Sequence, residues 1–191
     1  MFIASTRNQV LMGVLLVILM VLTRSHYFAT AHQLGDATWA IFFVAGIYSR
    51  TAWTFLGLLV LAWYLDYAAY TWGGVSDFCV TPAYVFLLPA YGSLWLAGCW
   101  YGKHHTTTWR SIAHLTLSAV AGLSLCELLS SGGFYFFSGR FIETSLVEFS
   151  ERTLHYFPSY AETFVFYLAV TMVIHTILTL TSPLTASQRN P

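Results

Sequence analysis

The amino-acid sequence predicts an all-α integral membrane protein, in which a single domain of residues 1–191 forms a bundle of six transmembrane helices. Hydrophobic residues make up 57% of the chain and charged residues only 8%, with a mean hydropathy of +0.65. Soluble domains carry about 25% charged residues. A membrane-spanning helix needs about 20 apolar residues, so this length accommodates about six with short connections. The net charge of zero and the lack of a basic tract argue against a nucleic-acid partner.

Six hydrophobic segments predict the individual helices: residues 10–25, 37–48, 51–70, 82–101, 110–129 and 159–180. The second is short, and the fourth contains Pro89, which a membrane helix tolerates as a kink. The first could instead be a secretory signal peptide, because Arg7 precedes its apolar run and small residues follow at 29–31. Arg24, Ser25 and His26 interrupt the approach to that cleavage site. We therefore expect a retained first helix.

Charged residues between the segments predict the orientation of the bundle. With both termini in the cytoplasm, five cations lie inside: Arg7, Arg50, Lys103, Arg110 and Arg189. The outer side then carries three cations and most of the acids: Arg24, Arg140, Arg152, Asp36, Asp77, Glu143, Glu148 and Glu151. This distribution follows the positive-inside rule. It places the loop at 71–82 and the segment at about 142–158 outside, facing the periplasm or the medium.

The segment at about 142–158 has apolar residues at helical spacing opposite a charged face. The apolar positions are Ile142, Leu146, Phe149, Thr153 and Phe157. Such a pattern predicts an amphipathic helix on the outer surface. We expect it to act as a lid over the bundle.

The region joining the third and fourth segments carries most of the candidate site residues. Asp66 is an acid inside a hydrophobic span, which is costly and usually functional. Helical spacing predicts that Asp66 and Tyr84 face one aromatic cavity if the two helices meet. Alternatively, Asp66 makes an interhelical hydrogen bond that only holds the bundle together. Five aromatic residues gather at this end: Trp63, Tyr67, Tyr70, Trp72 and Tyr84.

The three cysteines have different surroundings. Cys99 and Cys126 lie within apolar segments and are expected to pack as small hydrophobic residues. Cys79 lies on the loop, and the absence of a CxxC pair argues against a thiol–disulfide relay. A free thiol in an oxidising compartment is a liability unless it binds a metal or does covalent work. Cys79 is therefore a candidate metal ligand within a site for a large, flat ligand.

Three further charged residues have both structural and functional interpretations. Arg152 could pair with Glu148, four residues earlier, or bind an amide- or phosphate-bearing ligand. Glu162 suits the N-terminal end of the last span. Glu127, deep in the fifth span, has no evident partner.

The seven histidines form no metal-ligand pattern. His114 and His175 lie within spans and could ligate a haem, although lone helical histidines more often pack through hydrogen bonds. His26 and His32 lie near the outer surface and could approach a ligand.

Size, span layout and the DFCVTPAY stretch around Cys79 resemble the substrate-binding S components of energy-coupling-factor (ECF) vitamin transporters. The chain is most similar to the solitary BtuM-type cobalamin transporters of bacterial inner membranes. This resemblance implies uptake of cobalamin (vitamin B12), with Cys79 as axial ligand to the corrinoid cobalt. It also implies that Asp66 and Tyr84 line the pocket and that Arg152 contacts the corrin from the lid side. We add Trp63, Tyr67 and Phe78 as expected pocket residues.

The resemblance leaves an ECF energising module open as a partner, but the first span offers only Gly13 where S components often carry an AxxxA docking pattern, which agrees with a solitary transporter. The sequence also contains no GxxxxGK[ST] nucleotide-binding motif. We hypothesise that the Cys79 thiolate displaces the upper axial ligand of cobalt, including cyanide. Two other functions remain open from the residues alone: a haem-binding membrane redox enzyme, and a membrane scaffold whose polar residues only join its helices.

Overall fold

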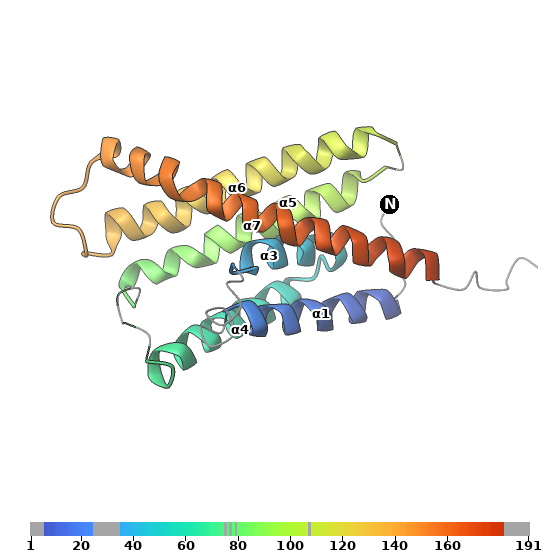
Figure 1. The fold of residues 1–191 in the computed structure, drawn as a ribbon, viewed down its shortest axis with the longest axis horizontal. Helices are drawn as coiled ribbons and strands as arrows, with labels where there is room; N and C mark the ends of the chain where they lie inside the picture. Colours follow the sequence, from blue (N-terminus) through green and yellow to red (C-terminus); the bar gives the residue numbers. More distant parts are fainter. Residues whose placement is uncertain are drawn as a thin grey trace, which may run out of the picture.

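The computed structural model describes residues 6–24, 35–74, 76, 78, 80–106 and 108–181, and every regular element in these ranges is helical. The elements are α1 (Thr6–Arg24), α3 (Thr38–Tyr48), α4 (Ala52–Thr71), the 3₁₀ helix η2 (Pro82–Phe86), α5 (Leu87–His104), α6 (Arg110–Phe137) and α7 (Leu146–Thr181). The predicted all-α class is confirmed. The helices α4 to α7 run in alternating directions along the long axis of the molecule (Figure 1).

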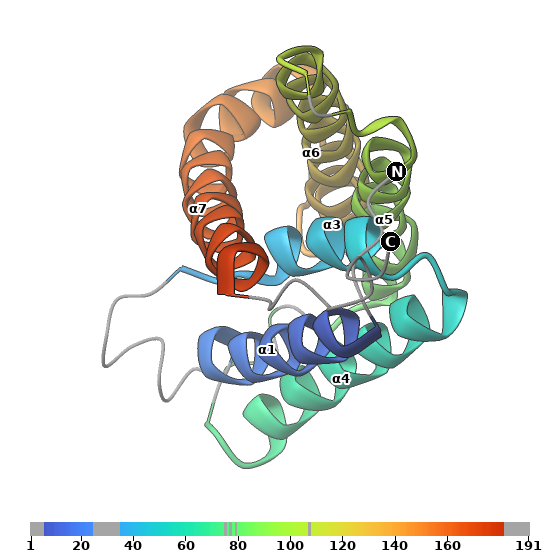
Figure 2. The ribbon, with the colours of Figure 1, turned by 90° about the vertical axis from the view of Figure 1, so that its right-hand side faces the viewer.

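The short helix α3 forms the centre of the bundle. Ten of its 11 residues are buried, as expected for a helix that is apolar on every side. Figure 2 shows α3 between α1 and α4 on one side and α5, α6 and α7 on the other. Phe42 stacks on Tyr91 of α5 with ring centroids 4.6 Å apart, and Phe43 packs edge-on against Phe164 of α7 at 5.4 Å. These aromatic contacts join helices that are distant in the sequence.

Two glycines allow the backbones of α3 and α5 to touch. A Cβ atom at Gly46 would collide with the carbonyl oxygen of Trp95, and one at Gly98 would collide with that of Phe43. Small residues permit such close helix packing in membranes. On the other side of α5, a Cβ at Gly122 of α6 would lie 2.9 Å from the Ala97 side chain. Helices α3, α5 and α6 therefore form one closely packed unit.

Four of the described helical segments are long and apolar enough to cross a membrane: Ala52–Thr71, Pro82–His104, Arg110–Phe137 and Leu146–Ile177. Their outward faces carry large apolar side chains, such as Val60, Val120 and Val165. The first two predicted spans, at 10–25 and 37–48, form shorter apolar helices. At 11 residues, α3 is about 16 Å long, roughly half the hydrocarbon thickness.

The segment at 10–25 belongs to the bundle, because Met12, Leu16 and Met20 of α1 are buried in the core that contains α3. The fourth predicted span begins as η2 and continues as α5. Pro89 lies in the first turn of α5, where the amide hydrogen that proline lacks would have no partner within the helix.

The last two helices are longer than the hydrophobic pattern predicted. α6 continues through the aromatic run at 134–137, and α7 begins at Leu146 instead of 159. The amphipathic segment expected as a separate surface helix at about 142–158 is thus mostly the first part of α7. Pro158 lies inside that helix, whereas it marked a helix boundary in the sequence. Ile142 and Leu146 are exposed, while Phe149, Thr153 and Phe157 are partly buried.

The candidate site lies near one end of the bundle, among the connections between helices. The turn between α6 and α7 and the C-terminal end of α4 lie at the left of Figure 1, and the C-terminal end of α1 lies nearer the middle of the molecule. The α3–α4 and α5–α6 connections lie at the opposite end.

Candidate functional site

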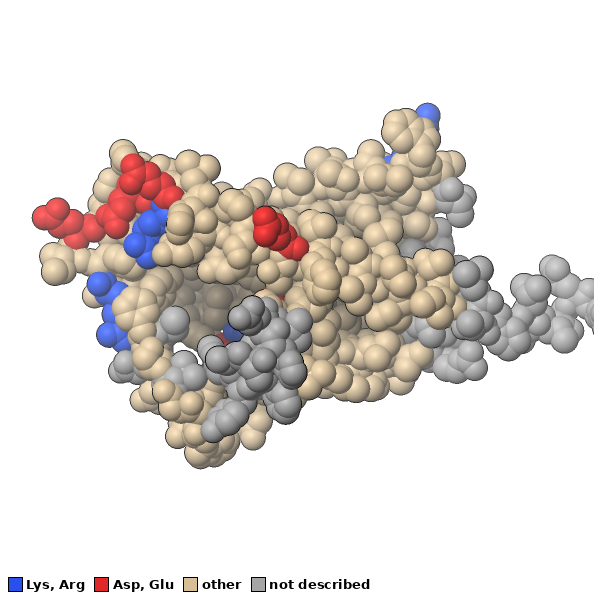
Figure 3. All heavy atoms as spheres, in the orientation of Figure 1, with Lys and Arg blue, Asp and Glu red and all other residues tan. Residues whose placement is uncertain are grey.

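A cavity of about 720 Å³ lies near the first of these ends. Figure 3 shows the molecule hollowed there, with acidic and basic side chains gathered beside the hollow. Side chains from α1, α4, η2, α5, α6 and α7 all contribute to its walls. The charged residues lining it are Arg24, Asp36, Asp66, Glu127 and Arg152. Cavities of this size are typical of small-molecule sites.

Arg24, the last residue of α1, is the centre of a polar network on one wall of the cavity. Its Nε and Nη2 atoms each donate to an Asp66 carboxylate oxygen at 2.7 Å. The Nη1 atom donates to Asp36 at 3.2 Å, to Thr38 at 2.8 Å and to Tyr91 at 3.3 Å. The Arg24 side chain is only 10% exposed. A buried guanidinium requires such compensation, and the paired bonds to Asp66 are a strong geometry.

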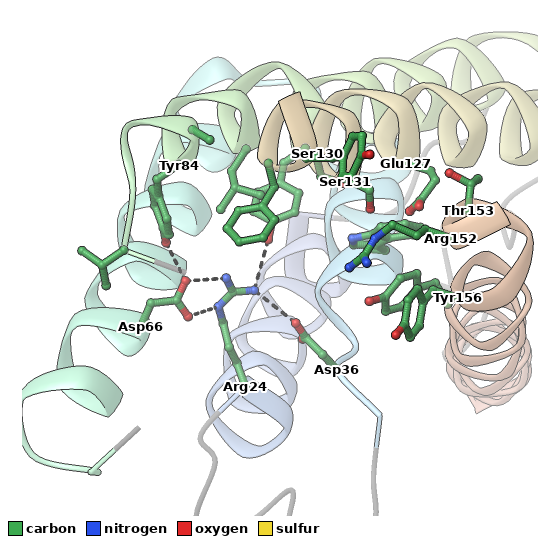
Figure 4. Close-up of a pocket in the computed structure, with 18 of the residues that line it drawn as sticks. Arg24, Asp36, Asp66, Tyr84, Glu127, Ser130, Ser131, Arg152, Thr153 and Tyr156 are labelled. Atoms are coloured by element: carbon green, nitrogen blue, oxygen red, sulfur yellow. Dashed lines mark hydrogen bonds and ion pairs between the residues drawn. The ribbon is translucent and has the colours of Figure 1, made fainter. Parts of the chain in front are cut away.

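Asp66 also accepts a hydrogen bond from the Tyr84 hydroxyl at 2.5 Å. The structure therefore brings together the acid of α4 and the tyrosine of η2, which both line the cavity. Figure 4 shows Arg24 between Asp66 and Asp36, with Tyr84 on the far side of Asp66. Asp66 joins α1, α4 and η2, so it has the helix-joining role considered above as well as a place in the cavity wall.

The network contains residues that the sequence did not single out. Asp36 holds the start of α3, because its Oδ1 atom accepts hydrogen bonds from the amide and the hydroxyl of Thr38. The sequence marks Arg24 only as an outer-side cation and as an interruption of a cleavage site. Arg24, Asp36 and Asp66 all lie at or near the predicted outer ends of the first three segments. This shared position is the signal in the sequence that could have indicated an ion-pair network. The folded structure shows that Arg24 binds both acids, which the sequence does not specify.

Arg152 lies on the α7 side of the same cavity. Its guanidinium is 3.9 Å from Glu148, the partner four residues earlier, and lies 4.9 Å from the centre of the Phe141 ring. Glu148 in turn accepts a hydrogen bond from Tyr135 at 2.9 Å. Both interpretations of Arg152 therefore have a structural counterpart: it pairs with Glu148, and it faces the cavity.

Three of the aromatic residues expected in the pocket lie elsewhere. Trp63 and Tyr67 stack with their ring centroids 5.7 Å apart on the outer surface of α4, about half exposed. Trp63 borders a separate apolar cavity of about 280 Å³, which Tyr84 also lines. Phe78 packs against Phe134 at 5.5 Å and beneath the Arg140 guanidinium. None of the three lines the large cavity described above.

Cys79 and its neighbour Asp77 lie outside the described residues, as do His26 and His32. Ser76 and Val80, on either side of Cys79 in the sequence, both line the large cavity. Cys99 and Cys126 are free and buried, as the sequence predicted.

The two histidines considered as haem ligands lie away from the cavity and make hydrogen bonds. His175 Nδ1 is 2.6 Å from the Tyr48 hydroxyl, which links α7 to α3. His114 Nδ1 is 3.2 Å from the carbonyl oxygen of His104. Within the described residues, no three His, Cys, Asp or Glu side chains are grouped as a metal site.

Neither a protein-family model nor a curated protein matches this chain. The residues and geometry of the cavity are therefore the basis on which a function can be inferred.

Proposed function

We propose that this chain is a six-span protein of a bacterial inner membrane that binds and takes up cobalamin and related corrinoids. It would be similar in architecture to the S components of ECF transporters and closest to the solitary BtuM type. The observation that carries the proposal is the placement of Asp66, Tyr84 and Arg152. These residues come from three separate parts of the sequence and line one large cavity.

The lining of the cavity suits a corrinoid chemically. A corrin is a broad, largely apolar disc with amides around its edge, so it needs flat apolar walls and a few polar contacts. Aromatic side chains contribute the flat walls: Trp39, Tyr70, Tyr84, Tyr91, Phe134, Tyr135, Phe141, Phe149, Tyr156 and Tyr160. The ion-pair network around Arg24 lies on one side, and Glu127 and Arg152 lie on the other (Figure 4).

Cys79 is the proposed axial ligand to cobalt. The neighbouring positions Ser76 and Val80 support this assignment because both line the cavity. A cysteine binds a metal as its deprotonated thiolate, so cobalt itself would favour loss of the Cys79 proton. Ligation by the thiolate would replace the upper axial ligand, and cyanide would leave with its electron pair when cyanocobalamin is bound.

We propose that the cavity faces the periplasm or the exterior and that uptake proceeds by helix rearrangement. Arg140, Glu143 and Glu148 lie near the end that contains the cavity, and Arg50, Lys103 and Arg110 lie near the opposite end. The second group would face the cytoplasm under the positive-inside rule. Any ATP-driven step would need a partner such as an ECF energising module.

The test is an absorption spectrum of the detergent-purified protein after expression with cyanocobalamin, measured beside Cys79→Ala. The matched control is Cys99→Ala, because Cys99 is buried away from the cavity. We expect a corrinoid spectrum in the parent and in the control, and a shifted or lost spectrum in Cys79→Ala. A colourless parent would support a scaffold, and a Soret band with bound iron would support a haem enzyme. Either result would refute the proposal.

A further inference from the structure

The α6–α7 wall of the cavity contains two buried polar atoms that make no hydrogen bond to any described residue. They are Oε2 of Glu127 and Oγ1 of Thr153. Glu127 is only 2% exposed. Both residues line the large cavity, and Figure 4 shows them near one another on α6 and α7.

Nearby polar groups do not satisfy these two atoms. The Ser130 hydroxyl donates to the carbonyl oxygen of Cys126 at 2.7 Å, so its proton is already used. Oε2 of Glu127 receives no hydrogen bond from the neighbouring Ser131 either. The Arg152 guanidinium lies against Phe141 and 3.9 Å from Glu148.

Leaving a buried polar atom unsatisfied costs about 1–3 kcal/mol, and such atoms usually have a specific reason to be present. Two of them lie on neighbouring helices in side chains that line one cavity, which points to a polar group that reaches them from the cavity. The carboxyl oxygen of Glu127 accepts a hydrogen bond, and the hydroxyl of Thr153 can donate one. The group that matches this pair has an N–H donor and a carbonyl acceptor on the same carbon.

We propose that Glu127 and Thr153 form a subsite for a primary carboxamide of the ligand. Glu127 Oε2 accepts a hydrogen bond from the amide N–H, and the Thr153 hydroxyl donates to the amide oxygen. This inference rests on the proposed function, because the corrin of cobalamin carries primary amides around its edge. The subsite would fix the rotation of the ring within the cavity. It is separate from Arg24 and Asp66, which satisfy each other.

The experiment compares four full-length variants in detergent by titration with cyanocobalamin. Glu127→Gln and Thr153→Ser keep an acceptor oxygen and a hydroxyl, whereas Glu127→Leu and Thr153→Val remove them. We expect Glu127→Gln and Thr153→Ser to bind cyanocobalamin with a Kd within about threefold of that of the parent. Glu127→Leu and Thr153→Val should each raise the Kd about tenfold, as loss of one buried hydrogen bond predicts. Glu162→Gln and Thr163→Val are matched controls on α7, because neither residue lines the cavity. Both controls should bind like the parent.

A second titration removes the amide from the ligand. The probes are monoesters of cyanocobalamin in which one ring amide is converted to a methyl ester, which has no N–H. For one of these esters we expect the parent to lose about tenfold in affinity, while Glu127→Leu loses nothing further, because contacting groups are not additive. This readout depends on recognition of the amide and does not respond to a general change in stability.

The outcomes separate the subsite from the proposed function. If the parent does not bind cyanocobalamin, both proposals are wrong. If the parent binds it but every ester costs the parent and Glu127→Leu the same, the carboxamide subsite is wrong and cobalamin binding stands. If Glu127→Leu does not fold, the same ester series with Glu127→Met decides the question, because methionine also lacks the acceptor oxygen and its flexible side chain fits irregular spaces.

Discussion

Arg24 and Asp66 join the ends of α1 and α4 through two hydrogen bonds of 2.7 Å, in a wall of the 720 Å³ cavity. The same arginine reaches Asp36 and Thr38 at the start of α3. One cation thus fixes the relative positions of three helices at the end that contains the cavity.

Replacing one member of this pair should destabilise the protein. Asp66→Asn leaves the buried Arg24 guanidinium without its main counter-charge, so we expect a loss of about 3 kcal/mol. The measurement is thermal unfolding of the purified protein in detergent. Glu162→Gln is the control, because Glu162 is exposed and forms no ion pair with a described residue.

The double variant Arg24→Met with Asp66→Leu should be more stable than the sum of the two single changes predicts, because it leaves no unpaired charge. Strict additivity would show that the pair is not coupled.

Removing the Tyr84 hydroxyl should weaken the site in a measurable way. Tyr84→Phe removes the bond of 2.5 Å to Asp66, and a hydrogen bond to a charged group contributes about 2 kcal/mol. Tyr70→Phe is a matched control, because Tyr70 lines the same cavity and its hydroxyl bonds to no described residue. Thermal unfolding should separate the two variants, and equal melting temperatures would contradict the assigned role of the bond.

The contact between α3 and α5 should not tolerate a methyl group. Gly98→Ala would place its Cβ against the carbonyl oxygen of Phe43, and we expect a loss of about 3 kcal/mol from overpacking. Gly57→Ala on α4 has no neighbour within 4 Å, so it should gain up to about 1 kcal/mol through helix propensity. Unfolding curves that move in the same direction for both would refute this packing arrangement.

At the opposite end of the bundle, burial lowers the pKa of His105 from its ordinary value of 6.5. The folded protein therefore disfavours the protonated ring, and stability should fall as pH decreases through about 6.5. The ring nitrogen Nδ1 lies 3.0 Å from the Tyr101 hydroxyl and 2.8 Å from that of Ser111. His105→Gln should reduce the difference in melting temperature between pH 7.5 and 5.5. An unchanged difference would assign the effect to other groups.

Hydrophobic patterning predicted where helices form, because burial in lipid or in the core selects long apolar runs. It placed the helix ends less well. The run Phe134–Phe137 lay beyond the predicted fifth span, and the segment before Pro158 was expected as a separate surface helix, yet they belong to the long helices α6 and α7. Their helices are stabilised by tertiary contacts, such as Phe149 against Phe136 at 5.4 Å, which local sequence does not specify.

The candidate site was likewise predicted only in part. Helical spacing was sufficient to suggest that Asp66 and Tyr84 meet, because each lies on a definite helix face. The partnership of Arg24 with Asp66 spans 42 residues and depends on how α1 packs beside α4. Trp63 and Tyr67 were expected to face inward with Asp66, but their side chains lie on the outer surface of α4. Aromatic character alone does not distinguish a ligand-facing ring from a lipid-facing one.

The backbone contact of Gly46 and Gly98 has a mechanical consequence. If helices α3 and α5 slid past one another, carbonyl oxygens that now lie against glycine would collide with the side chains of the facing helix. We therefore expect α3 and α5 to move as one rigid unit. Helices α1 and α7 pack against α3 through side chains such as Met20 and Phe164, and α4 does so through Phe55. Side-chain contacts of this kind can exchange partners at lower cost than backbone contacts. We expect a rearrangement of the bundle to move these three helices, and separation of α4 from α1 would require the two Arg24–Asp66 hydrogen bonds to break.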